Sequence, residues 1–243
     1  MTSLFNNAYS RDDIAYGLEP SASLEEALKQ YGRVDAKARR RALDLAAGAG
    51  RDTLALAGAG YQVDAVDLSE EGLKRIEQRA EERATRELIE THHQDAREFV
   101  IEPDAYDFVI GTTMLDHIPS GDADALFESM VRGLSDRGTL FIEVHSTSDP
   151  ACDVFPGSQN TEPVSETASA VVNYFPPGRL ALMALQSSRS LRILQYEERL
   201  EWDYTHGGEH QHGKAILLAT LDSHFPSWYG QPAAFPRQVD AAS

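Results

Sequence analysis

The amino-acid sequence predicts an α/β fold built on a mostly parallel β-sheet, and three observations point to it. An apolar run over residues 42–46 is typical of a buried strand, and a glycine turn at 48–50 follows it directly. A helix is expected from Thr53, and a second strand over 61–67 closes on Asp67. Asp67 lies about 20 residues beyond the glycine turn, the distance at which a carboxylate binds ribose hydroxyls in βαβ nucleotide sites.

Hydrophobic periodicity carries the alternation of helices and strands through the rest of the chain. The expected helices cover 23–31, 122–134 and 177–187, and Ser23 caps the first of them. A further helix is capped by Ser69 and lies in a charged stretch that reaches residue 90. The expected strands begin near 88 and at 106 and then cover 139–145 (after a turn at 135–138), 191–196 and 214–221. The last two strands form an antiparallel hairpin. The predicted fold is a Rossmann-like three-layer sandwich with a seven-stranded, mostly parallel sheet, an antiparallel last strand and helices on both faces.

Composition limits the kind of partner. The net charge of −17 over 243 residues repels phosphate backbones and anionic lipid surfaces, which argues against nucleic acid and membrane as partners. A neutral or cationic small molecule fits this charge better. Cys152 is the single cysteine, so neither an internal disulfide nor a cysteine metal cluster can form. The first residues lack a basic and apolar leader pattern, and we expect a cytoplasmic protein.

Two motifs resemble those of a known family. Residues 44–52 (DLAAGAGRD) and 65–69 (AVDLS) resemble motifs I and II of the class I S-adenosylmethionine (SAM)-dependent methyltransferases. The Gly-Arg-Asp ending is similar to the tellurite-resistance and thiopurine methyltransferase-like branch. The family usually has glycine where this chain has Ala46. The dinucleotide pattern Gly-x-Gly-x-x-Gly is not completed after Gly48, so the sequence favours SAM over NAD.

The resemblance covers about Tyr16 to Leu221 and implies where SAM would bind. In motif III the acid at the position of Asp95 accepts from the adenine amino group, and the next backbone amide meets a ring nitrogen. The family's N-terminal segment often folds over SAM, which makes residues 1–35 a helical lid here; a frayed end is the alternative. The expected cofactor-binding residues are Tyr9, Tyr16, Asp44, Ala46, Gly48, Gly50, Arg51, Asp67, Leu68, Asp95, Ala96 and Thr112.

Candidate catalytic residues follow the later strands, whose carboxyl ends face the ligand crevice. His117 follows the strand that begins at 106 and is either a general base or a cap of the next helix, the role we favour. His145 ends the strand 139–145 and is the stronger candidate. Tyr174 lies in a segment that resembles the family's Tyr-Phe-x-Pro-Gly-x-Leu, where it offers a ring face and a hydroxyl. His210 is the fourth candidate.

A histidine-rich segment precedes the last strand. His210 and His212 share one strand face, and His206 or Glu209 would complete an imitation of a two-histidine, one-carboxylate metal site. The resembling branch often has His-x-His-Gly at this place without a metal. We therefore expect pocket or structural histidines and no metal ligand.

The whole chain, residues 1–243, is expected to form a single SAM-binding domain. Its segment 146–180 is an insertion that shapes the substrate pocket, and 222–243 is a loosely packed tail. The favoured function is methyl transfer to a small-molecule acceptor, as in secondary metabolism. One alternative consumes SAM differently, by cyclisation to a four-membered amino acid or by aminocarboxypropyl transfer, and releases methylthioadenosine. A metalloid-binding resistance protein is the other alternative.

Overall fold

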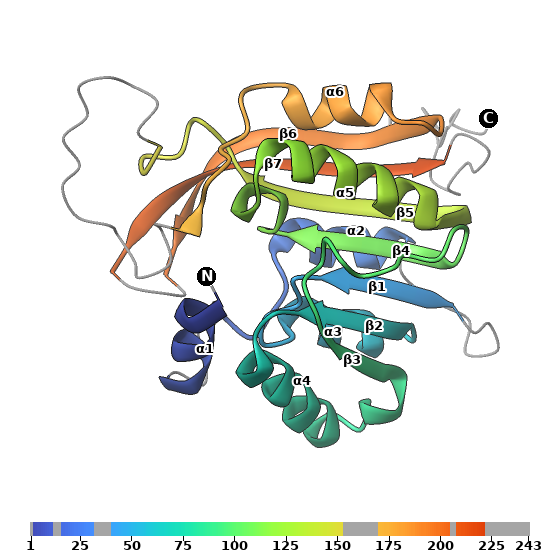
Figure 1. The fold of residues 1–243 in the computed structure, drawn as a ribbon, viewed down its shortest axis with the longest axis vertical. Coiled ribbons are helices and arrows are strands. Elements are labelled where there is room, and N and C mark those ends of the chain that lie inside the picture. Colours follow the sequence, from blue (N-terminus) through green and yellow to red (C-terminus); the bar gives the residue numbers. More distant parts are fainter. Residues whose placement is uncertain (1, 12–15, 32–39, 153–169, 205–207, 222–243) are drawn as a thin grey trace, which may run out of the picture.

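The structure, a computed structural model, describes residues 2–11, 16–31, 40–152, 170–204 and 208–221. In these residues one seven-stranded sheet runs in the order β3-β2-β1-β4-β5-β7-β6 (Figure 1). Its strands are β1 (Arg41–Leu45), β2 (Gln62–Asp67), β3 (Ile89–His93), β4 (Tyr106–Thr112), β5 (Leu134–His145), β6 (Leu191–Asp203) and β7 (His210–Leu221). The first five strands pair in parallel, and β7 runs antiparallel to both β5 and β6. The predicted Rossmann-like class, with its antiparallel last strand, is confirmed.

The central strand β1 is where the direction of strand addition reverses. It pairs with β2 on one side and with β4 on the other. The connections from β1 and from β4 therefore leave toward opposite faces of the sheet, and a crevice opens at the carboxyl ends of these two strands. The glycine turn at 48–50 and the exit of β4 are placed at this crevice by topology alone.

Helices cover both faces of the sheet. They are α1 (Thr2–Arg11), α2 (Ala22–Tyr31), α3 (Arg51–Gly58), α4 (Glu70–Glu82), α5 (Ser120–Gly133) and α6 (Arg179–Gln186), with short 3-10 turns η1 (Arg86–Leu88) and η2 (Leu115–His117). One buried cluster joins α5 and α6 to the sheet, and a second joins α2, α3 and α4 to the opposite face. Figure 1 shows α5 and α6 in front of the sheet, α2 and α3 behind it, and α1 beside α4. Among the described residues, no helix combines the length and apolar character that crossing a bilayer requires.

Several element boundaries differ from the sequence predictions. The residue that caps α2 is Ser21, whose hydroxyl accepts from the backbone N–H of Leu24, and not Ser23. The helix that begins after Ser69 ends at Glu82 and does not continue through the charged stretch to residue 90. The cap by Ser69 itself is confirmed, since its hydroxyl accepts from the Gly72 N–H.

Two predicted connections are part of strands instead. Residues 135–138 lie within β5 as an interruption of its ladder, because Tyr106 pairs with Leu134 whereas Phe108 pairs with Thr139. The segment 202–213 was expected to link the last two strands. Both of its ends pair within the hairpin, so β6 and β7 are longer than predicted. Residues 153–169 of the predicted insertion, His206 and the tail 222–243 lie outside the described residues.

Candidate functional site

A cavity of about 220 Å³ lies in the crevice at the carboxyl ends of the strands. Its lining begins at the glycine turn after β1 and reaches the ends of β5 and the start of β7. The N-terminal segment contributes Phe5, Tyr9 and Tyr16 to the same lining. One hollow therefore joins the predicted cofactor residues to the predicted catalytic histidines.

The glycine turn has an unusual start. Ala46 has a φ of +62°, in the left-handed region that favours glycine, which explains why the resembling family usually places glycine there. This conformation costs an alanine about 1–2 kcal/mol. Gly48 also has a positive φ, and a Cβ atom built on it would lie 2.4 Å from the hydroxyl of Tyr9. The backbone at Gly48 is thus held in direct contact with α1.

Asp67 ties the end of β2 to the glycine turn. Its carboxylate accepts from the Gly48 N–H at 2.8 Å and from the Ser69 N–H at 2.6 Å. Burial raises the pKa of Asp67, and the two backbone donors oppose that rise. A carboxylate offers about four lone-pair positions, more than its backbone donors use, so Asp67 can still accept from a hydroxyl donor of a ligand in the cavity.

Helix α1 covers the cavity from the side of α4. The side-chain oxygen of Asn6 accepts from the Ser69 hydroxyl at 2.5 Å, which fixes α1 at the start of α4. Tyr9 and Tyr16 meet edge to face with ring centroids 5.7 Å apart, and Phe5 lies edge to face with His117 at 5.6 Å. Three aromatic rings therefore screen the cavity from solvent on this side.

The contact between α4 and the glycine turn leaves no room for a side chain at Gly72, whose Cβ would lie 2.5 Å from the Gly48 carbonyl oxygen. We expect Gly72→Ala to lower the free energy of unfolding by about 1–3 kcal/mol, because backbone must move to admit the methyl group. Urea denaturation measures the loss. Gly58→Ala is the control, since nothing lies within 4 Å of a Cβ at the end of α3. Equal stabilities of the two variants would contradict this close packing.

Two buried acids stand at the centre of the crevice. Asp44 of β1 is 2% exposed, and burial together with the charge of Asp52 raises its pKa to about 8. The Thr53 hydroxyl donates to it at 2.5 Å. Glu143 of β5 is fully buried and accepts from the Lys214 ammonium of β7 at 2.7 Å. Burial alone would raise the pKa of Glu143, but Lys214 holds it below its ordinary value.

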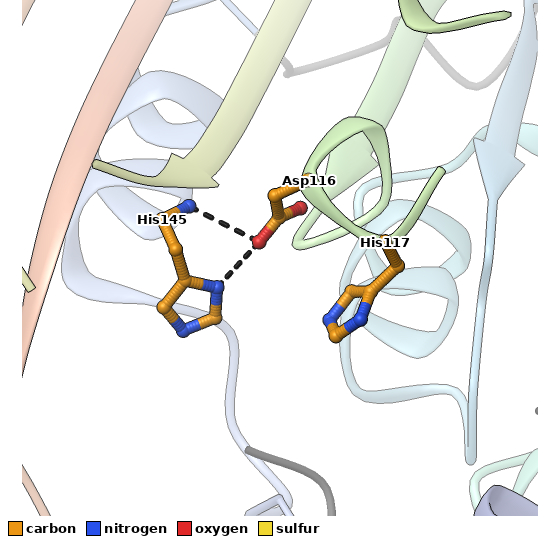
Figure 2. A group of neighbouring side chains, drawn as sticks. All are labelled: Asp116, His117 and His145. Atoms are coloured by element: carbon orange, nitrogen blue, oxygen red, sulfur yellow. Dashed lines mark hydrogen bonds and ion pairs between the residues drawn. The ribbon is translucent and has the colours of Figure 1, made fainter. Parts of the chain in front are cut away.

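The end of β5 places His145 against a buried carboxylate of η2 (Figure 2). Asp116 is fully buried, and its Oδ2 accepts from the His145 backbone N–H at 3.1 Å and bonds the ring Nδ1 of the same residue. Burial opposes the charged ring, but Asp116 holds the pKa of His145 above its ordinary value. The Asp116 contact fixes the ring, so Nε2 is the nitrogen that remains for a ligand.

Two other candidate residues lie next to His145. The ring centroids of His117 and His145 are 6.2 Å apart, and those of His145 and Tyr174 are 6.4 Å apart. His117 does not cap the following helix as we favoured from the sequence. The residue before α5 is Pro119, with no side-chain cap, and the His117 ring turns to the cavity instead.

A second histidine group continues from His145 into β7. The rings of His145 and His212 are 4.7 Å apart, and those of His210 and His212 are 4.6 Å apart. His212 Nδ1 lies 2.9 Å from an oxygen of Asp149, which also accepts from the Gly213 N–H at 3.0 Å. The backbone of Gly213 packs directly against that of Asp149, since a Cβ on Gly213 would lie 2.2 Å from the Asp149 nitrogen.

The cavity brings together most of the residues singled out from the sequence. Its lining includes the catalytic candidates His117, His145 and Tyr174; His210 is not part of the lining and contacts it through His212. Gly50 lies outside the lining and faces Ile76 of α4. The predicted cofactor residues in the lining are Tyr9, Tyr16, Asp44, Ala46, Gly48, Arg51, Asp67, Leu68, Asp95, Ala96 and Thr112.

Sequence reasoning missed several residues of this lining, among them the charged residues Glu143, Lys214 and Asp149. The first two carried a signal, because one acid inside the apolar strand 139–145 and one lysine opening 214–221 are out of place in buried strands. Asp149 carried none. It lies in a Ser- and Asp-rich turn and reaches His212, 63 residues away in the chain, only through the fold.

Known proteins resemble parts of this chain. Residues 42–138 match the family described as methyltransferase domain. The putative methyltransferase YqeM of Bacillus subtilis is 33% identical over 137 residues, which are 56% of this chain and 51% of that protein. The chain thus spans about half the length of the curated relative that it matches.

Solved structures extend the likeness to most of the fold. TehB of Haemophilus influenzae has a TM-score of 0.64 at 18% identity, over 83% of this chain and 62% of that one. A 1,6-didemethyltoxoflavin-N1-methyltransferase of Burkholderia thailandensis, solved with 1,6-didemethyltoxoflavin and S-adenosylhomocysteine, has a TM-score of 0.56 at 17% identity, over 82% and 77%. At these identities the likeness concerns the fold. Residues 42–138 therefore match a methyltransferase domain in sequence, and the sheet that carries them is similar in fold to a methyltransferase solved with S-adenosylhomocysteine.

Proposed function

We propose that this protein is a SAM-dependent methyltransferase that acts on a small-molecule acceptor, of the branch that resembles tellurite-resistance and thiopurine methyltransferases. The single observation that carries the proposal is the cavity, which runs from the glycine turn to His145 beneath α1. Its volume of about 220 Å³ and its aromatic cover suit a small acceptor better than a macromolecule. The strongly negative net charge supports the same choice.

The residues around the glycine turn fit SAM. Asp67 offers acceptor positions to ribose hydroxyls, and Asp95 and Ala96 line the place expected for adenine. The hydroxyl of Thr112 is buried in the lining with no hydrogen-bond partner among the described residues, as expected where a polar ligand completes the site. When bound, SAM supplies a methyl group that its positively charged sulfur activates. Tyr9 can offer a ring face to that charge.

At the other end of the cavity, His117, His145 and Tyr174 surround the place proposed for the acceptor. SAM would supply the methyl group to a lone pair of an acceptor held there, and the electron pair of the broken carbon–sulfur bond would stay on sulfur. The protein contributes alignment and exclusion of water. Asp116 contributes to alignment by fixing the His145 ring.

Product analysis tests the proposal. We expect purified protein to leave SAM intact when no acceptor is present, and to release S-adenosylhomocysteine when a suitable small thiol, amine or metalloid oxyanion is added. Mass spectrometry identifies the sulfur product. Formation of methylthioadenosine from SAM alone would contradict methyl transfer and would support cyclisation or aminocarboxypropyl transfer instead.

The role proposed for Asp67 is tested by Asp67→Ala. We expect SAM affinity to fall by about 1–3 kcal/mol, or about 5- to 150-fold, because the ribose loses a charged acceptor and the Gly48 N–H loses its partner. Isothermal titration with SAM measures it. Glu81→Ala, on the exposed face of α4, is the control and should bind as the wild type does. An unchanged affinity in Asp67→Ala would show that SAM binds elsewhere.

A further inference from the structure

We propose that His145, Asp149 and His212 bind a divalent first-row metal ion at the acceptor end of the cavity. One ligand atom from each of these three residues lies within 4.8 Å of the other two. All three residues are buried and line the cavity. Two imidazoles and one carboxylate form a donor set that suits zinc and its neighbours and leaves coordination positions open.

The hydrogen bonds of His210 and His212 favour a cation next to Asp149. His210 Nδ1 lies 2.6 Å from the Gly208 carbonyl oxygen, which only accepts, so this nitrogen carries the proton and Nε2 of a neutral ring has a lone pair. That Nε2 lies 2.9 Å from His212 Nε2, which must therefore donate. A neutral His212 then has its second lone pair on Nδ1.

Two hydrogen-bond acceptors, His212 Nδ1 and a carboxylate oxygen of Asp149, therefore face one another. The lone pair of His212 Nδ1 points at an Asp149 carboxylate oxygen 2.9 Å away, and a contact of this kind needs a cation between or beside the two atoms. A metal ion bound to both atoms and to His145 satisfies these contacts with neutral rings. An extra proton on His210 or on His212 is the competing solution, and the experiment below separates it from a metal ion.

The surroundings of the three ligands are those of a metal site. Metal-bound histidines usually have their other ring nitrogen held by a carboxylate or another polar group. Asp116 holds Nδ1 of His145, and His210 holds Nε2 of His212. Asp203 adds a further carboxylate, 3.9 Å from His212 Nε2. Negative charge therefore gathers around the imidazoles and favours a divalent cation.

The role of the ion rests on the proposed function, whereas its binding does not. A divalent ion at His145 would bind an oxygen, nitrogen or sulfur of the acceptor and favour its deprotonated, nucleophilic form. The acceptor class that fits is accordingly one with an ionisable donor atom, such as a hydroxyl or a thiol. From the sequence we expected no metal ligand, because His210 and His212 were considered together with His206 or Glu209 and not with His145 and Asp149.

Metal binding is tested on the full chain after treatment with EDTA and dialysis. Isothermal titration with Zn²⁺ is expected to give one site per chain, and Co²⁺ at the same site reports coordination through its visible absorption. Asp149→Asn and His145→Ala should each weaken zinc binding by at least about 100-fold. Asp116→Asn, which removes only the partner of a ligand, should weaken it by about 10- to 100-fold.

A second group in the described chain provides the matched control. Asp64, Glu90 and His92 meet the same distance criterion but lie on β2 and the edge strand β3, outside the lining of the cavity, so His92→Ala should leave zinc affinity and stoichiometry unchanged. A wild-type chain that takes up no zinc, or zinc uptake that survives both Asp149→Asn and His145→Ala, would overturn the inference and leave the extra proton as the answer.

A separate titration with SAM keeps the two proposals distinguishable. SAM binding by Asp149→Asn shows that this variant is folded. If the wild-type chain binds SAM but not zinc, the metal site fails while the proposed function stands. If zinc binds with one site and SAM does not, the proposed function fails and the metal site stands.

Discussion

Lys214→Met is expected to lower the free energy of unfolding by about 3–5 kcal/mol. Lys214 is 8% exposed and its ammonium is 2.7 Å from Glu143, which is fully buried. Removing the lysine leaves the carboxylate in a low-dielectric interior without its hydrogen-bonded counter-charge, and the more distant Arg51 compensates its desolvation only in part. Urea denaturation in the presence of EDTA measures the loss without a contribution from bound metal.

Two further variants show whether the effect comes from the buried charge. Lys74→Met removes exposed ion pairs with Glu70 and Glu71 and should change stability by less than about 1 kcal/mol. Adding Glu143→Leu to Lys214→Met removes the orphaned carboxylate, so most of the lost stability should return. A double variant as unstable as Lys214→Met would contradict the explanation.

Asp44 is expected to make stability fall as the pH rises. Burial raises its pKa to about 8, so the folded protein keeps a proton that the unfolded chain releases near pH 4. The contribution is complete below pH 4, decreases between pH 4 and 8 and is constant above, with a total on the order of 5 kcal/mol. Asp44→Asn has no proton to lose.

The wild type and Asp44→Asn are therefore compared over a series of pH values. We expect the free energy of unfolding of Asp44→Asn, relative to the wild type, to increase steadily from pH 4 to pH 8. Urea denaturation at unit intervals of pH measures it. Parallel curves for the two proteins would show that Asp44 is not held protonated by burial.

The sequence predicted well which residues meet at the glycine-turn end of the cavity, because the relation between them is local. The glycine turn and Asp67 belong to adjacent elements of one βαβ unit, so a short stretch of chain fixes their relation. The antiparallel hairpin of β6 and β7 was equally readable from the last two apolar runs. The ends of β6 and β7 could not be read from the sequence, because the hydrogen-bonded ladder between the two strands extends through polar residues.

The acceptor half was predicted only as separate residues. His145 and His117 were expected at strand ends, but their meeting with Asp116, and the role of Asp116 as the partner of His145, come from the packing of η2 against the end of β5. The helix-capping role of His117 was wrong, because Pro119 already precedes α5 and the ring is free to turn to the cavity.

By itself, then, the sequence determined the α/β class, the order of its elements and a ligand crevice at the glycine turn, since these depend on periodicity and short spacings. Only the tertiary structure decided that Asp149 meets His212 and that Lys214 meets Glu143. Both contacts join residues more than 60 positions apart, and both are buried. Their energies come from desolvation and from the geometry of β7 against β5, and neither quantity is encoded in any local pattern of residues.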